Sequence, residues 1–200
     1  MPVSEWKGKN LTAMSNDECL RVCDEVRQEL LRTVSQTGGH LASNLGTVEL
    51  TVALHRVFDF EKDRLVFDVG HQCYTHKMLT GRADQMNTLR KLGGLSGFPK
   101  PHESRSDAFI AGHASNSVSV ALGMARARTQ LGEDYRGVAL IGDGALTGGL
   151  AYEGLSDAGQ SGEKLLVILN DNGMSIRKNV GGIAKLLARQ HLGEGYLKFK

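Results

Sequence analysis

The turn Gly142-Asp143-Gly144 is the pattern in the sequence that most clearly suggests chemistry, and it follows an apolar run at residues 138–141. Two glycines around one residue, between a strand and a helix, let backbone N–H groups approach a phosphate at the helix N-terminus. A carboxylate in such a cradle repels phosphate unless a cation lies between them. Asn172, after the next apolar run, offers a second oxygen, and these oxygens together with those of a diphosphate suit Mg²⁺. The spacing alone does not decide between this metal site and a simple tight turn with a capping residue at Asn172.

Two common nucleotide-binding motifs do not match this turn. The dinucleotide fingerprint needs a glycine three residues after Gly144, but the next glycine is Gly148, one residue too late. The sequence also has no phosphate loop of the Gly-Lys-Ser or Gly-Lys-Thr type. A nucleotide-binding Rossmann domain is therefore the weakest of the functions that we consider.

Histidines at glycine-rich turns are candidates for proton transfer. His40 follows two glycines and His71 follows one, and exposed imidazoles at such turns exchange protons near neutral pH. Either residue taken alone is also compatible with a structural role. His71, His76 and His113 could suggest zinc, but they lack the i, i+4 spacing of a zinc-binding helix, and no cysteine pair has ligand spacing. A zinc site is therefore disfavoured.

Helices and short apolar strands alternate along the chain and would position these residues. A capping-box pattern at Ser15 and Glu18 predicts a helix that ends at Gly38-Gly39. Periodicity predicts helices over 47–57, 117–131 and 147–158, helical pieces over 76–92, a loop over 93–101, and strands over 65–69, 109–110, 138–141 and 165–169.

Continuous apolar strands separated by helices predict an α/β fold, with a mostly parallel sheet and helices on both faces. In such sheets, ligands bind beyond the carboxyl ends of the strands. Polar clusters follow the predicted strands, at residues 68–71, 112–115, 142–144 and 170–172. The polar residues thus lie where a ligand would bind.

The composition is that of an ordinary globular domain, with 200 residues, 40% hydrophobic and 23% charged. A formal charge of +2 gives no basic excess for nucleic acid, and no apolar run reaches the ~20 residues of a membrane span. Residues 1–10 lack the apolar core of a secretory signal. Cys19, Cys23 and Cys73 form no pattern, and the first two fall in the apolar stripe of a helix, which indicates reduced thiols. We therefore expect a cytoplasmic protein.

Six segments taken together resemble 1-deoxy-D-xylulose-5-phosphate synthase, a thiamine diphosphate enzyme of the transketolase type. They are residues 39–50 (GHLASNLGTVEL), 67–72 (FDVGHQ), 93–99 (GGLSGFP), 112–117 (GHASNS), 141–149 (IGDGALTGG) and 168–176 (ILNDNGMSI). The Gly-Asp-Gly turn with its downstream Asn is general to the superfamily, and the FDVGHQ and LNDN segments narrow the resemblance to this synthase. It covers nearly all of residues 10–190, in the expected order.

The resemblance implies a role for individual residues. The implied metal ligands are Asp143, Asn172 and the backbone carbonyl of Met174. The implied contacts to thiamine diphosphate come from His71, Gly112, His113, Ala114, Asp143, Gly144, Ala145 and Asn172. His40 and His71 are the implied catalytic residues, and His40 matches a histidine assigned to proton transfer at the reacting carbonyl.

The resemblance also implies a reaction and an assembly. The family joins pyruvate to D-glyceraldehyde 3-phosphate with loss of CO2, an entry step to isoprenoids that also feeds thiamine synthesis, and we expect a homodimer. Its chains have about three domains. We therefore expect residues 1–200 to be one truncated, diphosphate-binding N-terminal domain, inactive without the pyrimidine-binding and C-terminal domains. The alternative is a truncated, non-catalytic paralogue that acts as a binding or interaction module.

Overall fold

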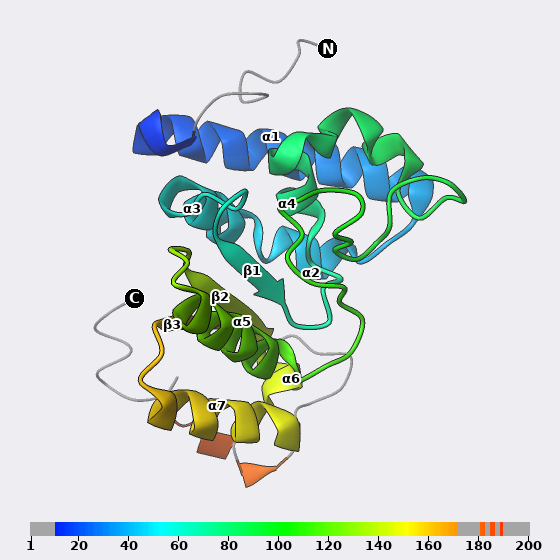
Figure 1. Ribbon diagram of the computed structural model, residues 1–200. Helices are drawn as coiled ribbons and strands as arrows, with labels where there is room; N and C mark the ends of the chain where they lie inside the picture. The colour runs from blue at the N-terminus through cyan, green and yellow to red at the C-terminus, as the bar shows by residue number, and fades with distance from the viewer. Residues whose placement is uncertain (1–10, 172–180, 183–184, 187–188, 190–200) are drawn as a thin grey trace.

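The computed structural model describes residues 11–171, 181–182, 185–186 and 189. Over these residues the chain is an α/β fold with a three-stranded sheet in the order β1-β2-β3 (Figure 1). The strands are β1 (Arg64–Phe67), β2 (Gly137–Gly142) and β3 (Leu165–Asn170). Both strand pairs are parallel. The predicted parallel α/β fold is confirmed.

One face of the sheet packs against helices from the first half of the chain. These are α1 (Asn16–Thr37), α2 (Leu41–Leu45), α3 (Val48–Val57) and α4 (Tyr74–Lys77). In Figure 1, α1, α3 and α4 are drawn above the sheet and α2 beside β1. Leu65 and Phe67 of β1 point into the same core as Val26 and Leu30 of α1. Because successive side chains point to opposite faces of a strand, the side chain of the intervening Val66 points to the other face of the sheet.

The other face packs against α5 (Ser117–Leu131) and α7 (Gly149–Ser161), drawn below the sheet. Val66 of β1 and Ala139 of β2 meet Val118 and Ala121 of α5 in this second core. The two cores account for helices on both faces, as the sequence predicts. The short helix α6 (Asp143–Leu146) connects β2 to α7.

The capping box predicted at the start of α1 is present. The Glu18 N–H donates to Ser15 Oγ at 3.3 Å, and the Ser15 N–H donates to Glu18 Oε2 at 2.7 Å. Cys19 and Cys23 are buried in the apolar stripe of this helix, as predicted. Burial raises the pKa of the Cys23 thiol to about 11, so that it stays protonated at neutral pH.

Several predicted boundaries are wrong. No strand forms at residues 109–110. Phe109 does not lie in the sheet, and its apolar side chain packs against the core that includes α5. The strand predicted over 65–69 ends at Phe67, since Val69 has a φ of +58° that a strand cannot contain. The helix predicted over 147–158 begins two residues later, at Gly149, and continues to Ser161.

Short helical segments account for the remaining differences. The Gly142-Asp143-Gly144 turn leads directly into α6, and α2 is too short to give a periodic pattern. The helical pieces predicted over 76–92 are α4 followed by η2 (Met78–Arg82) and η3 (Ala83–Thr88), and a 3₁₀ turn, η1 (Leu11–Ala13), precedes α1. In the described residues, no helix combines the length and apolar character needed to cross a membrane.

Candidate functional site

The carboxyl ends of the three strands lie at one edge of the sheet. Gly142, the last residue of β2, pairs with Asn170, the last residue of β3. Asp143 therefore leaves the sheet beside the start of the segment that contains Asn172. Asn172 and Met174, two of the three implied metal ligands, lie outside the described residues.

Asp143 places a buried carboxylate at this edge. It is the first residue of α6, and its exposed fraction is 6%. In the described residues, no group of three or more His, Cys, Asp or Glu side chains lies close enough to hold a metal ion. A cation at Asp143 would therefore need other oxygens, such as amide, carbonyl or phosphate oxygens, which is the ligand set that Mg²⁺ accepts.

The segment after β1 shapes the loop that carries Gly112, His113 and Ala114. Asp68, 1% exposed, accepts hydrogen bonds from the Ser115 N–H at 2.7 Å and the Ser117 N–H at 3.0 Å. Ser117 begins α5, so the carboxylate also lies at the positive end of that helix. The three loop residues themselves are exposed, and the His113 carbonyl accepts a hydrogen bond from the Val69 N–H at 3.3 Å.

Ser115 joins this loop to α6. Its hydroxyl donates to the Ala145 carbonyl at 2.7 Å. A Cβ at Gly148 would overlap Ser115 Oγ, so this glycine is needed for the close approach of the two segments. Ser115 has a φ of +72°, and Val69 at the end of β1 has a φ of +58°. Non-glycine residues in this conformation are strained, and such strain is concentrated at functional sites.

His40 and His71 lie together at this edge. Their ring centroids are 5.0 Å apart, and the rings are inclined at 66°. The pKa of His71 lies below its ordinary value because of burial and the neighbouring His40, although Asp68 acts in the opposite direction. His71 Nδ1 is buried and has no hydrogen-bond partner among the described residues, so a polar ligand atom could satisfy it.

Sequence analysis did not assign a role to Asp68 or Ser115, whose hydrogen bonds hold the loops of this site together. Asp68 follows a strand directly within a polar cluster, and that position was the available signal. Cys73, whose role the sequence left open, is fully buried, and burial raises its pKa to about 12. Its thiol therefore stays protonated at neutral pH and is a poor nucleophile.

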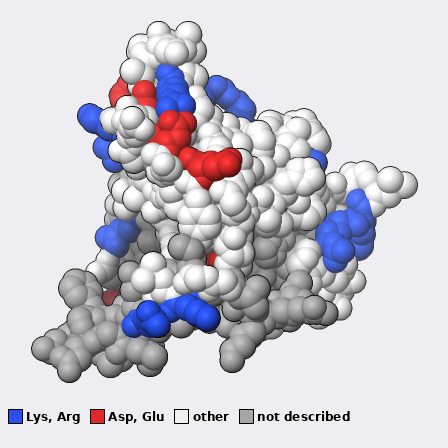
Figure 2. Space-filling model, turned by 90° about the horizontal axis from the view of Figure 1, so that it is seen from below, with Lys and Arg blue, Asp and Glu red and all other residues white. Residues whose placement is uncertain are grey.

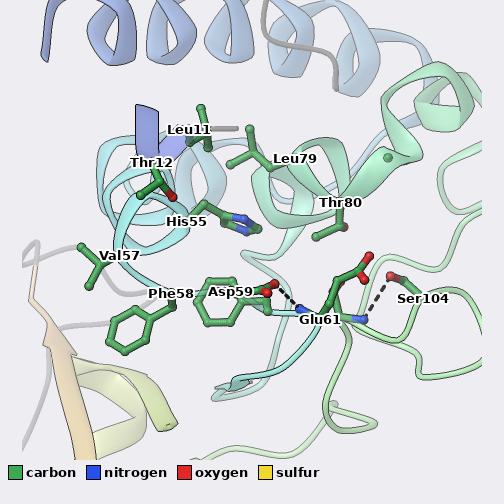
Figure 3. A pocket seen from close by; sticks show the side chains of 13 residues that line it. Leu11, Thr12, His55, Val57, Phe58, Asp59, Glu61, Leu79, Thr80 and Ser104 are labelled. Atoms are coloured by element: carbon green, nitrogen blue, oxygen red, sulfur yellow. Dashed lines mark hydrogen bonds between the residues drawn. The ribbon is translucent and has the colours of Figure 1, made fainter. Parts of the chain in front are cut away.

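A second candidate is a pocket of about 630 Å³ near the amino end of β1 (Figure 3). His55 and Thr80 line it, together with residues 57–61 and the segment around Ser104. Its polar walls are already paired: His55 Nε2 lies 2.9 Å from His76 Nδ1, and the Thr80 hydroxyl donates to the His76 carbonyl at 2.6 Å. His55 thus has a hydrogen-bond partner within the protein. A ligand is therefore needed less in this pocket than at the unpartnered Nδ1 of His71.

Next to this pocket lies a set of ionisable residues with little solvent exposure, which we call the charged cluster. Its members are His76, Lys77, Arg82, Glu103 and Asp107. Asp107 accepts two hydrogen bonds from Arg82, at 2.7 and 2.8 Å, and Lys77 Nζ lies 2.5 Å from Glu103 Oε2. Burial alone would raise the pKa of Asp107, but hydrogen bonds from Arg82 and His76 outweigh it and hold that pKa well below its ordinary value. The cluster joins α4 and η2 to the 93–107 segment.

The three histidines weighed for zinc lie in different settings. His76 belongs to the charged cluster, His71 faces His40, and His113 is exposed on its loop. On the face shown in Figure 2, the charged side chains that are described form small groups of both signs and no continuous field of one sign.

Comparison with known proteins gives a consistent result. A family model described as 1-deoxy-D-xylulose-5-phosphate synthase matches residues 5–200. Curated proteins of that name from Clostridium tetani (strain Massachusetts / E88) and Clostridium kluyveri (strain NBRC 12016) are 58% and 56% identical to this chain, over 94% and 96% of its length. The namesake from Syntrophomonas wolfei is 53% identical over 96% of the chain. The chain spans only 30–31% of the length of these relatives, and corresponds to their N-terminal part.

Proposed function

Because the chain belongs to the 1-deoxy-D-xylulose-5-phosphate synthase family, we propose that it forms the part of such an enzyme that binds the diphosphate of thiamine diphosphate through Mg²⁺. The observation that carries this proposal is the buried carboxylate of Asp143 between Gly142 and Gly144, at the edge where β2 and β3 end together. A carboxylate there needs a cation before phosphate can approach.

The proposed metal ligands are Asp143, Asn172 and the Met174 carbonyl. Of these, Asp143 lies in the described residues, and Gly142, the residue before it, pairs with Asn170, which is two positions before Asn172 in the sequence. This set of three oxygens leaves positions for water and phosphate oxygens, which Mg²⁺ usually retains. In this proposal the cation neutralises the repulsion between Asp143 and the diphosphate.

The proposed diphosphate contacts are Gly144 and Ala145, with Gly112, His113 and Ala114 on the facing loop. The hydrogen bond from Ser115 to the Ala145 carbonyl supports this grouping because it ties the two loops together. The buried, unpartnered Nδ1 of His71 is the kind of group that a bound cofactor would satisfy.

The proposed reaction is that of the complete enzyme, the condensation of pyruvate with D-glyceraldehyde 3-phosphate with loss of CO2. Thiamine diphosphate, when bound, supplies the carbanion chemistry, and the protein binds, orients and moves protons. In this chain, His71 stays neutral at pH 7 because burial lowers its pKa, so it can exchange a proton with a ligand or with His40. His40 is the proposed proton-transfer group at the reacting carbonyl.

The metal site can be tested by isothermal titration of the 200-residue chain with thiamine diphosphate, with and without Mg²⁺. We expect binding that requires Mg²⁺ and is lost in Asp143→Ala. The matched control is Asp157→Ala on α7, which removes the carboxylate of an exposed ion pair with Arg126 of α5. This change should leave binding intact. Binding without Mg²⁺, or equal binding by the Asp143 variant, would contradict the proposal.

The chain alone should form little product from the two substrates, because it covers about 30% of the relatives' length. Misplacement of one end of a cofactor by about 1 Å already costs on the order of 10²-fold in rate. Robust turnover by the isolated chain would show that the single-domain assignment of residues 1–200 is wrong.

We also propose that the chain self-associates. Large apolar side chains are exposed on described elements, among them Leu20 and Leu31 on α1 and Leu166 and Leu169 on β3. Exposed apolar surface of this kind favours association. Light scattering at micromolar concentration should therefore detect a species heavier than one chain, and a stable monomer would count against the homodimer.

A further inference from the structure

Asn44 is a fully buried amide whose hydrogen-bonding groups are all directed at backbone atoms. Its exposed fraction is 0%. The amide nitrogen donates to the His40 carbonyl at 2.7 Å and to the His71 carbonyl at 2.9 Å. The amide oxygen accepts from the Tyr74 N–H at 2.9 Å. Both N–H donors and the oxygen are thus used, a set of bonds that few other side chains could make.

The bonds to His71 and Tyr74 connect segments that no strand or helix joins, whereas His40 is the cap residue of α2, the helix that contains Asn44. His40 lies at the start of α2, His71 lies in the loop after β1, and Tyr74 begins α4. Asn44 lies 27 residues from His71 in the sequence but bonds to it directly. The side chain therefore fixes the backbone of one catalytic candidate relative to the backbone of the other.

Resting on the function proposed above, we propose that Asn44 is a positioning residue that holds His40 and His71 at a fixed separation at the cofactor edge of the sheet. It acts through the two backbone carbonyls and touches neither imidazole in the described contacts. The rings stand 5.0 Å apart at 66°, close enough for each to affect the other. Groups that must exchange protons are effective only when such supporting bonds lock their geometry.

The chemistry of the amide explains why asparagine suits this position. Aspartate has the same shape and could still accept from the Tyr74 N–H, but it has no N–H to donate to the two carbonyls. Alanine removes all three bonds. Either change leaves the His71 carbonyl without the amide donor, whereas the His40 carbonyl keeps only the hydrogen bond from the Asn44 N–H at 3.3 Å. The loss favours movement of the two segments relative to each other.

Thr47 provides a matched control one turn further along the chain. It is equally buried, and its hydroxyl lies 3.2 Å from the Asn44 carbonyl and 3.4 Å from the Gln72 carbonyl. Thr47→Val removes a buried hydroxyl next to the same loop without touching the carbonyls of His40 and His71. It therefore reports the effect of a simple loss of stability.

The test compares the 200-residue chain with Asn44→Ala, Asn44→Asp and Thr47→Val by NMR of the imidazole signals, without cofactor. The groups identified as acting on His71 are His40 and Asp68. In both Asn44 variants we expect the ring-to-ring cross-relaxation between His40 and His71 to disappear and the pKa of His71 to move up towards its ordinary value. In Thr47→Val both signals should match the unchanged chain, even if its melting temperature falls. If Asn44→Ala does not fold, the ring-to-ring cross-relaxation in Asn44→Asp decides, because the new carboxylate by itself raises the pKa of His71.

Titration with thiamine diphosphate and Mg²⁺ then separates this inference from the proposed function. We expect affinity to fall on the order of tenfold in the Asn44 variants and by less than about twofold in Thr47→Val. An unchanged histidine pair in the Asn44 variants would overturn the role of Asn44, whatever the chain binds. If the unchanged chain does not bind the cofactor but the histidine pair is disturbed in the variants, the proposed function is overturned. The positioning role of Asn44 is then still supported.

Discussion

Two regions of the molecule use buried polar groups in different ways. At the carboxyl edge of the sheet, Asp68 and Asn44 bond to backbone N–H and C=O groups of the loops. In the charged cluster, Asp107 and Glu103 pair with the side chains of Arg82 and Lys77. Each of the two carboxylates also accepts one backbone N–H, from Lys100 and Ser96 respectively. The first arrangement fixes the path of the backbone, whereas the second joins side chains of opposite charge from separate segments.

The two regions also differ in what they leave available. The edge keeps strained backbone at Val69 and Ser115, an unpartnered nitrogen on His71, and an exposed loop around His113. Each of these features costs stability, and each could be used by a ligand. In the charged cluster the carboxylates pair with the cations, although Arg82 Nε has no hydrogen-bond partner among the described residues. Stability should depend most on single residues there, because each removed charge leaves a buried partner of opposite sign.

The largest effect should follow removal of charge at Asp107. In Asp107→Asn the buried Arg82 loses its main partner, and we expect the free energy of unfolding to fall by about 3–5 kcal/mol. Urea unfolding of the chain measures this change. In Asp157→Asn, where the exposed pair with Arg126 is lost, the unfolding midpoint should hardly change. A similar small change in both variants would show that the charged cluster does not stabilise the fold.

Asp68→Asn should have a smaller effect on stability and a larger one on ligand binding. Its two bonds to backbone N–H groups would be weakened or broken, at a cost of about 1–3 kcal/mol. Because those bonds shape the loop of Gly112 and His113, affinity for thiamine diphosphate with Mg²⁺ should fall as well, as measured by calorimetry.

Asp63 gives this experiment a close control at the other end of β1. It is also buried, and it accepts from the Arg136 N–H at 2.8 Å and the Asp59 N–H at 3.0 Å. Asp63→Asn should cost a similar amount of stability without changing affinity. Equal losses of affinity in both variants would mean that Asp68 acts through stability alone.

Much of this fold could be predicted because local patterns determine it. The capping box at Ser15 fixed the start of α1, and helical spacing gave both ends of α5 at Ser117 and Leu131. The apolar runs gave all three described strands and their parallel arrangement. The false strand at residues 109–110 shows the limit, since two apolar residues cannot reveal whether they pack on a helix or pair in a sheet.

The site was harder to predict because its contacts join distant positions. Asp68 bonds to Ser115 and Ser117, which follow it by 47 and 49 positions. Asn44 bonds to His71, which follows it by 27 positions. No local period records such pairs. Sequence analysis could identify Asp143 only because glycines flank it at the end of an apolar run. The role of Ser115 depends on its positive φ, which the neighbouring residue types do not predict.

Close approach of the two loops should make Gly148 sensitive to a single methyl group. In Gly148→Ala the new Cβ would displace the Ser115 hydroxyl from the Ala145 carbonyl, and we expect a loss of about 1–2 kcal/mol in urea unfolding. Adding Ser115→Gly should restore stability, because it removes both the overlap and the positive-φ strain. Gly149→Ala is the control, since a Cβ there meets nothing within 4 Å. A neutral Gly148→Ala would show that the loops are not tightly joined.

The smallest expected effect is the pH dependence of stability near neutrality. Burial lowers the pKa of both His55 and His76, and each also faces a charge or a neighbouring imidazole. The folded state keeps these rings neutral, whereas the unfolded chain binds protons once the pH falls below about 6.5. Their contribution to stability is therefore complete above that pH and is lost as the pH decreases, by less than about 1 kcal/mol for each histidine between pH 7.5 and 6.

His55→Gln separates the two regions in this experiment. It removes one neutral imidazole beside the charged cluster, so the slope of unfolding free energy against pH should decrease in urea titrations between pH 7.5 and 6. His71→Gln at the carboxyl edge should reduce the slope less, since Asp68 partly offsets the lowering of its pKa. A larger reduction from His71 would mean that the edge, and not the charged cluster, controls how this protein responds to acid.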